Sequence, residues 1–258
     1  MRIRPVPSIT AILAIAMILL AAAPASAGIT TGSVCRVRNV TQATMFGSPS
    51  GQALTDAIEA ADAGDTLRIR GTCVGSFTLD KNLTLIGRRS LDKPTILDGG
   101  GAGRVIAVDV GTSATIRRLV VTGGSSGVGG GGGINVSEGA RLNLRASLVA
   151  KNEATNVGGG IVNGGTLRMR SSVVIRNHAG IDGGGIYNFG DLRVARSAIN
   201  RNVAEGVGGG LFNEGTALLR GSAVRRNIAS SGGGILNVNT LTLEFTEVSD
   251  NQPDDCAC

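Results

Sequence analysis

The sequence contains very few aromatic and histidine side chains. Among 258 residues there is no Trp and one Tyr, aromatic residues make up 2%, and His178 is the only His. Stacking of bases on aromatic rings is a main means of holding single-stranded nucleic acid, so this composition argues against a nucleic-acid partner. A lone His also has no second imidazole to share a metal with, and we expect His178 to be a solvated loop residue.

Lysine is scarce too, since Lys81, Lys93 and Lys151 are the only Lys among 25 basic residues, and the net charge is +6. Glycine, in contrast, occurs 41 times. So much glycine suggests collagen or a low-complexity chain, but there is no Gly-X-Y period, and Ile, Val and Leu are frequent between the glycines. The glycines must therefore serve a packed structure, and the length allows one sizeable domain with a large core.

No apolar run reaches the ~20 residues that a membrane-spanning helix needs. The run Ile9–Ala23 is shorter, follows Arg2 and Arg4, and precedes Ala25-Ser26-Ala27, which is the pattern of a signal peptide. We therefore predict a signal peptide over 1–27, and a secreted or cell-surface protein. Loss of the two arginines leaves a mature charge of +4 (6 − 2). We expect no transmembrane segment in the mature chain.

The rest of the chain repeats a short unit. Five glycine runs are each followed by an aliphatic residue, and the successive spacings are 27, 25, 25 and 24: Ile134, Ile161, Ile186, Leu211 and Ile235. Each unit closes on an asparagine: Asn152, Asn177, Asn202, Asn227 and Asn251. A Ser or Thr precedes each of these by five residues: Ser147, Ser172, Ser197, Ser222 and Thr246. A period this regular indicates a repeat architecture.

Each unit reads as short strands joined by sharp corners. "TLRMR" and "DLRVA" alternate apolar and polar residues with period 2, and Gly and Asn stand at the breaks, where positive φ is tolerated. A unit of this kind buries its apolar face only by stacking on its neighbours. We predict an all-β solenoid, with the aliphatic residue of each unit in the core. The closing Asn is predicted to adopt the left-handed corner and to hydrogen-bond to its copies in adjacent turns.

The chain divides into an N-terminal segment over 28–65 and the repeats over 66–258. Leu54, Ala57, Ile58 and Ala61 are spaced as one face of a short helix, which Gly64 would end. Such a helix would cover the open strand edges of the first turn. From residue 66 to 251 there are 186 residues, which at ~25 per turn and ~4.8 Å per turn gives seven or eight turns and about 35 Å.

The GGG-[IL]-x-N units, together with "GDTLRIRGTCVGSFTLDKNLTLIG" and "TILDGGGAGRVIAVD" upstream, resemble the right-handed parallel β-helix proteins of the pectate-lyase-like superfold. In particular the chain is similar to exported bacterial proteins akin to polymorphic outer-membrane protein repeats. The resemblance covers about Val34 to Asp255, and implies a right-handed solenoid. It does not imply an activity, because one fold hosts many functions.

Four cysteines in an exported chain suggest disulfides, with three possible pairings. Cys256 and Cys258 should lie about 35 Å from the first turn, whereas bonded cysteines have Cα atoms within about 7 Å. We therefore predict that Cys35 pairs with Cys73, as the resemblance also implies. Cys256 and Cys258 are then free, paired with each other, or used between chains.

No catalytic residue, cofactor site or metal site is predicted. Enzymes of the superfold use clustered carboxylates, but Asp182 and Asp191 have no further Asp in their columns, and Asp98 belongs to a turn sequence. The glycines over 123–133 lack the G-K-[ST] of a phosphate loop. The loops are too short to wall a substrate cleft. A carbohydrate-active enzyme, a lyase or a hydrolase with an atypical site, remains the alternative function.

The repeats also place basic residues at recurring positions. One set directly precedes the closing Asn: Lys151, Arg176, Arg201 and Arg226. Another set precedes the Ser position by two residues: Arg145, Arg170 and Arg220. One residue per turn would arrange these charges in rows. Like charges in a row repel each other, and an anionic ligand that binds along the row would explain why they are placed there. We predict an exported, non-catalytic binding or structural protein whose ligand is an anionic polysaccharide or cell-envelope polymer. A solvated face neutralised by counterions is the alternative.

The last repeat replaces basic residues by acidic ones. Glu244, Glu247 and Asp250 fall in the columns of Arg220, Ala223 and Arg226. Charge at a sheet edge discourages edge-to-edge association, so we expect a monomer.

Overall fold

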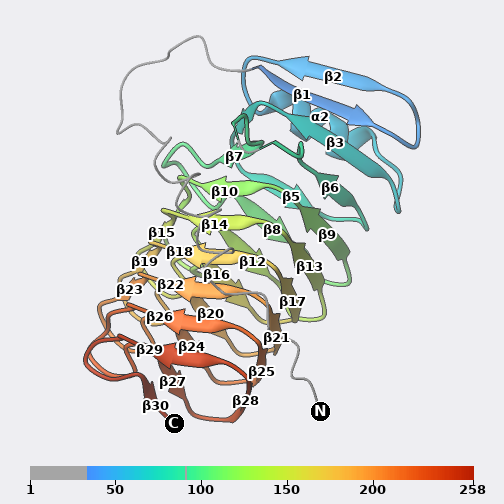
Figure 1. The fold of residues 1–258 in the computed structure, drawn as a ribbon. Helices are drawn as coiled ribbons and strands as arrows, with labels where there is room; N and C mark the ends of the chain where they lie inside the picture. The colour runs from blue at the N-terminus through green and yellow to red at the C-terminus, as the bar shows by residue number, and fades with distance from the viewer. Residues whose placement is uncertain (1–33, 91) are drawn as a thin grey trace.

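The computed structural model describes residues 34–90 and 92–258. The signal peptide predicted over 1–27 lies outside the described residues. The described chain is a parallel β-solenoid of about seven turns with one short helix near its N-terminal end (Figure 1), which confirms the predicted fold class.

Four sheets run along the solenoid; each repeat contributes one strand to sheets A, B and C, and the short sheet D receives no strand from the last two repeats. Sheet A has ten strands: β1 (Cys35–Asn39), β2 (Met45–Ser48), β3 (Thr66–Arg70), β6 (Thr84–Ile86), β9 (Ser113–Arg117), β13 (Arg141–Arg145), β17 (Thr166–Arg170), β21 (Asp191–Ala195), β25 (Thr216–Arg220) and β28 (Thr240–Glu244). Sheet B has eight: β4 (Thr72–Val74), β7 (Ile96–Asp98), β10 (Val120–Thr122), β14 (Leu148–Ala150), β18 (Val173–Ile175), β22 (Ala198–Asn200), β26 (Ala223–Arg225) and β29 (Glu247–Ser249).

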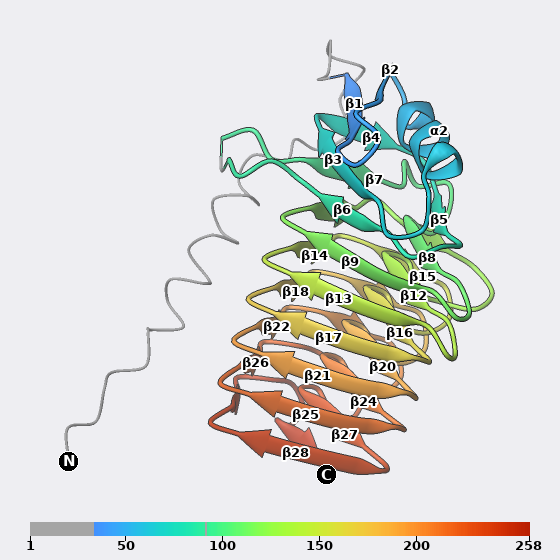
Figure 2. The same cartoon turned by 90° about the vertical axis from the view of Figure 1, so that its right-hand side faces the viewer.

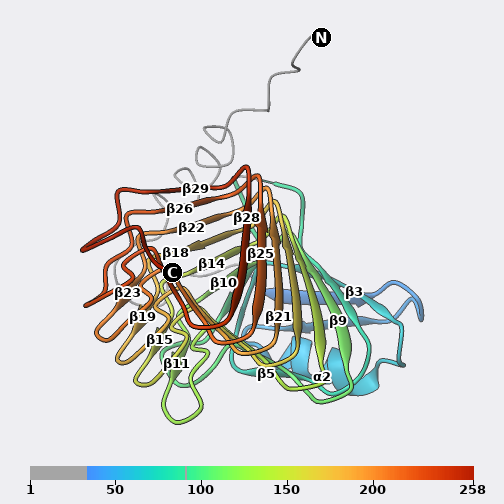
Figure 3. The same ribbon diagram turned by 90° about the horizontal axis from the view of Figure 1, so that it is seen from below.

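The remaining two sheets complete each turn. Sheet C has eight strands: β5 (Phe77–Leu79), β8 (Ile106–Val108), β12 (Ile134–Val136), β16 (Ile161–Asn163), β20 (Ile186–Asn188), β24 (Leu211–Asn213), β27 (Ile235–Asn237) and β30 (Cys256–Ala257). The short sheet D has four: β11 (Ser125–Ser126), β15 (Glu153–Ala154), β19 (His178–Ala179) and β23 (Val203–Ala204). Seen along the axis, sheets A and B meet at a sharp corner (Figure 3).

The N-terminal end is closed by two elements. Helix α2 (Gln52–Ala60) buries Ala53, Leu54, Ala57 and Ile58, as the spacing of its apolar residues predicts. The helix ends at Ala60 and its C-cap residue, Ala61, is extended, so Gly64 belongs to the following turn and does not stop the helix. The hairpin of β1 and β2, which the sequence analysis did not predict, pairs antiparallel with β3 and so covers that edge of sheet A.

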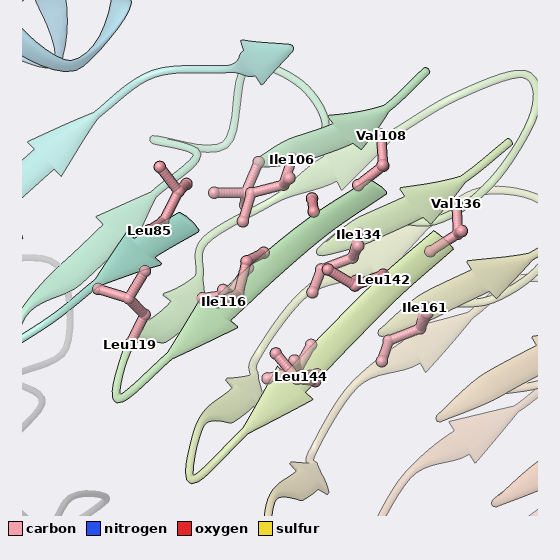
Figure 4. Packing of buried hydrophobic residues seen from close by; sticks show 14 of the residues in the cluster. Leu85, Ile106, Val108, Ile116, Leu119, Ile134, Val136, Leu142, Leu144 and Ile161 are labelled. Atoms are coloured by element: carbon pink, nitrogen blue, oxygen red, sulfur yellow. The ribbon is translucent and has the colours of Figure 1, made fainter. Parts of the chain in front are cut away.

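The core consists of stacked columns of aliphatic side chains. The residue after each glycine run is buried without exposed surface, and its copies pair in register across sheet C: Ile134, Ile161, Ile186, Leu211 and Ile235. Figure 4 shows two members of this column, Ile134 and Ile161, beside Leu142 and Leu144 of sheet A. Burial of each such side chain contributes about 1.5 to 3 kcal/mol, and the columns therefore carry the stability of the solenoid.

The glycine runs are required by the close approach of successive turns. A Cβ on Gly159 would overlap the main-chain oxygen of His178, and one on Gly160 would overlap that of Gly185. Both oxygens belong to the next turn. This confirms that the corner leaves no room for side chains. The chain can therefore turn sharply there and place the next residue, such as Ile161, in the core column.

The closing asparagines form the predicted ladder. Each buried Nδ2 donates to the Oδ1 of the copy in the next turn, with a distance of 3.0 Å from Asn152 to Asn177, from Asn177 to Asn202 and from Asn202 to Asn227. Asn227 donates to Asn251 at 2.9 Å, and Asn251 donates to Asp255. Asp255 is therefore the acceptor that ends the ladder.

The left-handed corner, however, lies one residue earlier than predicted. The positive φ values belong to the residue before each asparagine: Lys151 (56°), Arg176 (55°), Arg201 (52°), Arg226 (56°) and Asp250 (59°). The asparagine itself is needed one position later, because only there does its amide point into the solenoid interior and reach its copies. The prediction that the Asn takes this conformation was wrong.

A second asparagine ladder runs along the end of sheet C. Asn163 donates to Asn188 at 2.6 Å, Asn188 to Asn213 at 2.7 Å, and Asn213 to Asn237 at 2.7 Å. The turn above Asn163 has Val136 at this position, so the ladder ends there and the buried Oδ1 of Asn163 has no partner.

The cysteines are paired as two disulfides. Cys35 and Cys73 are bonded with a Cα separation of 4.8 Å, as predicted. Cys256 is bonded to Cys258, with Cα atoms 5.4 Å apart, which selects one of the three alternatives left open for this pair. The described residues thus contain no free cysteine.

Candidate functional site

The first predicted basic row lies on the outer face of sheet A. Arg145 pairs in register with Arg170, and Arg220 occupies the same column two turns on, with Ala195 between them. All three arginines are exposed, because side chains alternate between core and solvent along each strand. Sheet A presents this face as a continuous series of parallel strands (Figure 2).

The same column contains arginines that the sequence analysis missed. Arg117 pairs with Arg145, and Arg38 pairs with Arg68 at the N-terminal end, where Ile86 separates the two groups. A neighbouring column contains Arg168 and Arg193 in register. These residues lie outside the most regular repeats, or at a different position of the strand. Following the strand register from Arg145 toward the N-terminus reaches Arg117 on the next strand and Arg68 two strands beyond it. Adjacent strands lie about 4.8 Å apart, so the face carries a dense set of positive charges.

The second predicted row lies at the corner after sheet B. Lys151, Arg176, Arg201 and Arg226 directly follow β14, β18, β22 and β26, one on each turn. Lys151, Arg176 and Arg226 are exposed and Arg201 is half-exposed. The structure therefore groups the seven predicted residues into two rows, one at each end of the sheet B strands.

Carboxylates neutralise only the C-terminal end of these rows. Glu244 lies 3.3 Å from Arg220, and Asp250 lies 3.9 Å from Arg226. Glu247 is hydrogen-bonded to Arg225, which lowers the pKa of Glu247. Among the described residues, Arg145, Lys151, Arg170, Arg176 and Arg201 form no ion pair. Five of the seven predicted residues are thus unneutralised cations.

Other residues considered from the sequence have structural contacts. Asp98 accepts a hydrogen bond from the main chain of Gly100 in a turn, and Asp182 accepts one from Val207. His178 is not a loop residue but part of β19, where it is partly exposed between Glu153 (4.0 Å) and Glu205 (3.7 Å). Within residues 34–90 and 92–258, no three His, Cys, Asp or Glu side chains gather closely enough to hold a metal ion.

Half of the chain's six aromatic residues meet on the outer side of sheet C. Tyr187 packs edge-on against Phe212, with ring centroids 5.2 Å apart, and against Phe189 at 6.1 Å. Tyr187 donates a hydrogen bond to Glu214, and burial together with that carboxylate raises the pKa of Tyr187. The repeat alignment could have revealed the pairing of Tyr187 with Phe212, because they are equivalent positions 25 residues apart. Phe212 is buried, Tyr187 is half-buried and Phe189 is exposed, so the cluster lies at the surface and packs against this side of the solenoid.

Comparisons with protein-family models, with curated proteins and with solved structures found no match to this chain. The solenoid is therefore established by the structure itself, while the resemblance to one superfold stays an expectation. In the part of the chain that the structure describes, no helix has the length and apolar character needed to cross a bilayer.

Proposed function

We propose that this chain is an exported, non-catalytic solenoid that binds an anionic polymer along its two rows of basic side chains. The proposal extends the resemblance to exported β-helix proteins, for which a surface or extracellular role is expected. Its main support is the in-register stacking of unneutralised cations on successive turns. A polymer with a negative charge on each repeating unit can contact such a row at several turns at once.

The backbone of the corner row adds a second argument. An L-residue in the left-handed conformation costs roughly 1 to 2 kcal/mol, and Gly and Asn are the residues that usually occupy it. This chain uses glycine freely, yet the corner contains Lys151, Arg176, Arg201 and Arg226 at φ between 52° and 56°. The corner before sheet B holds residues of other kinds in the same conformation, such as Ala146 and Ser171, so the recurrence of a cation, and not the conformation alone, points to a role beyond the fold. A long cationic side chain is what these four residues have in common.

Electrostatic repulsion within the rows argues in the same direction. Two unit charges 4 Å apart repel by about 1 kcal/mol in water, and a row of them accumulates this cost along the axis. An anionic ligand would remove the repulsion and gain attraction at each turn. Since the contacts are exposed, binding should weaken as salt is added.

The test is a screen of the pure protein against an array of polysaccharides, scored for retention and for released product. Retention of anionic polymers without product supports the proposal, and product release would support the carbohydrate-active enzyme instead. Arg145→Ser with Arg170→Ser should reduce retention. Arg88→Ser with Arg89→Ser is the matched control, because it removes two exposed arginines outside both rows. Equal retention by both double variants would refute the assignment of the rows.

A further inference from the structure

The turns that join sheet C to sheet A carry an exposed ridge of side chains along one edge of the solenoid (Figure 2). Phe189, Glu214 and Val238 occupy the same position on three successive turns, since each main-chain N–H donates to the sheet C asparagine one turn before it. Phe189 is 49% exposed, Val238 is 62% exposed, and Glu214 is also exposed. The two preceding turns have Ser137 and Gly164 at this position, so the fold itself does not require large apolar residues there.

The ridge borders the aromatic cluster of sheet C. Tyr187 is half-buried, packs edge-on against Phe189 and donates a hydrogen bond to Glu214. A Cβ on Gly164 would lie 2.5 Å from the Cζ of Phe189, so the ring covers a glycine of the preceding turn. We call Tyr187, Phe189, Glu214 and Val238 the acidic aromatic patch. Exposed apolar side chains gathered at one place mark interaction surfaces, and the patch is therefore a candidate site for a ligand.

Negative charge surrounds this patch in a chain that is basic as a whole. Among the described residues, Glu214 and Asp182 form no ion pair, whereas Asp191 is paired with Arg193 at 3.6 Å. Burial, the hydrogen bond to Glu214 and the negative charges of Glu214 and Asp182 raise the pKa of Tyr187. The ring thus lies in the negative potential of two carboxylates, and a positively charged ligand would be attracted to it.

An arginine side chain matches the patch best. Its guanidinium bonds a carboxylate through two parallel N–H groups and stacks on aromatic faces, and its aliphatic stem packs on apolar surface. Because Tyr187 and Glu214 are hydrogen-bonded, a guanidinium paired with Glu214 lies beside the aromatic ring. Phe189 and Val238 are two turns apart, or about 10 Å, which an extended chain spans with about three residues. The patch therefore fits a short peptide segment better than a single small cation.

We propose that the acidic aromatic patch binds an arginine-bearing segment of a partner polypeptide. The guanidinium pairs with Glu214 beside Tyr187, and apolar residues of the same segment contact Phe189 and Val238. The patch lies at the start of the sheet A strands, whereas the basic row of sheet A lies near their ends. The interaction goes beyond the proposed function, because it adds a protein partner at a surface separate from the polymer.

Tyr187 makes the test local, because it is the only Tyr in a chain without Trp. Its fluorescence reports on this patch and on no other surface. The chain from Gly28 is titrated with the peptide acetyl-Leu-Arg-Leu-amide, and with the same peptide containing citrulline in place of arginine. Citrulline keeps the shape of arginine but has no charge. The arginine peptide should change the Tyr187 emission saturably and bind about tenfold more tightly than the citrulline peptide.

Variants of two exposed residues identify the contacts. Glu214→Gln should weaken binding of the arginine peptide about tenfold, and Phe189→Ser should weaken it about threefold. Glu59→Gln on α2 and Phe245→Ser after β28 are the matched controls, because they make the same changes at exposed residues elsewhere. Both controls should bind the peptide as the parent does.

Several results would overturn the proposal. They are Tyr187 emission that does not respond to the arginine peptide, an equal response to the citrulline peptide, or equal binding by Glu214→Gln at unchanged melting temperature. A stronger response to neutral dextran would assign the patch to a carbohydrate, and emission that changes with protein concentration alone would assign it to a second copy; either would also overturn it. Retention of anionic polymers tests the proposed function separately, because the patch variants keep every cation of both rows.

Discussion

The asparagine ladder permits a sharp test within one turn. Asn202 is fully buried and makes four side-chain hydrogen bonds: its Nδ2 donates to Asn227 and to the oxygen of Val174, and its Oδ1 accepts from the side chain and the main chain of Asn177. Asn202→Ala removes all four and leaves the main-chain N–H of Asn177 without an acceptor. Each net hydrogen bond contributes about 1 kcal/mol, and a buried orphan donor costs about 1 to 3 kcal/mol. We expect a loss of about 4 to 6 kcal/mol.

Asn200 is the matched control, since it lies two residues away and is also buried. Among the described residues its side chain makes no hydrogen bond, and its Oδ1 is unpartnered. Asn200→Ala should therefore change stability by less than about 1 kcal/mol. Chemical denaturation followed by circular dichroism gives both values from the chain that begins at Gly28. Variants that differ by less than about 1 kcal/mol would refute the ladder as a main source of stability.

Further predictions concern the core, the disulfide and the open end. Ile186→Asp places an unpaired charge in a fully buried column, and we expect loss of the cooperative thermal transition; an unchanged melting temperature would contradict the column. Reduction of the Cys35–Cys73 disulfide should lower stability by about 2 to 4 kcal/mol, measured by denaturation with and without reductant, whereas equal midpoints would show that the hairpin is held by other contacts. The parent should be a monomer by light scattering at neutral pH, and self-association is expected when the three carboxylates of the last turn are replaced together: Glu244→Ser, Glu247→Ser and Asp250→Ser. A monomeric triple variant would remove their protective role.

The 25-residue period was sufficient to predict the solenoid, because a repeating aliphatic residue must occupy equivalent places on every turn. Ile161 and Ile186 illustrate this, since they pair in register in sheet C. The left-handed residue was misplaced by one position, because propensity favours Asn there, whereas the geometry requires the amide of Asn177 in the interior and leaves the strained position to Arg176. Tertiary geometry outweighed local preference in this case.

Features that depend on which face a side chain occupies were harder to predict. "SVVIRN" identifies a strand, but it does not show that Val173 and Ile175 point outward while Val174 points inward. The β1–β2 hairpin was missed because its pairing with β3 is antiparallel and lies outside the repeat. The basic rows were predicted from spacing alone, and the register extended one of them to Arg117.

The most direct test of the central claim replaces corner cations by glycine: Lys151→Gly, Arg176→Gly and Arg201→Gly in one chain. Glycine adopts the left-handed corner without the cost that L-residues incur, so the melting temperature should stay the same or rise. Affinity for dextran sulfate at low salt, measured by titration calorimetry with neutral dextran as control, should fall at least tenfold. If the variant melts at a lower temperature and binds dextran sulfate as tightly as the parent, the cations serve the fold, and the proposed function is wrong.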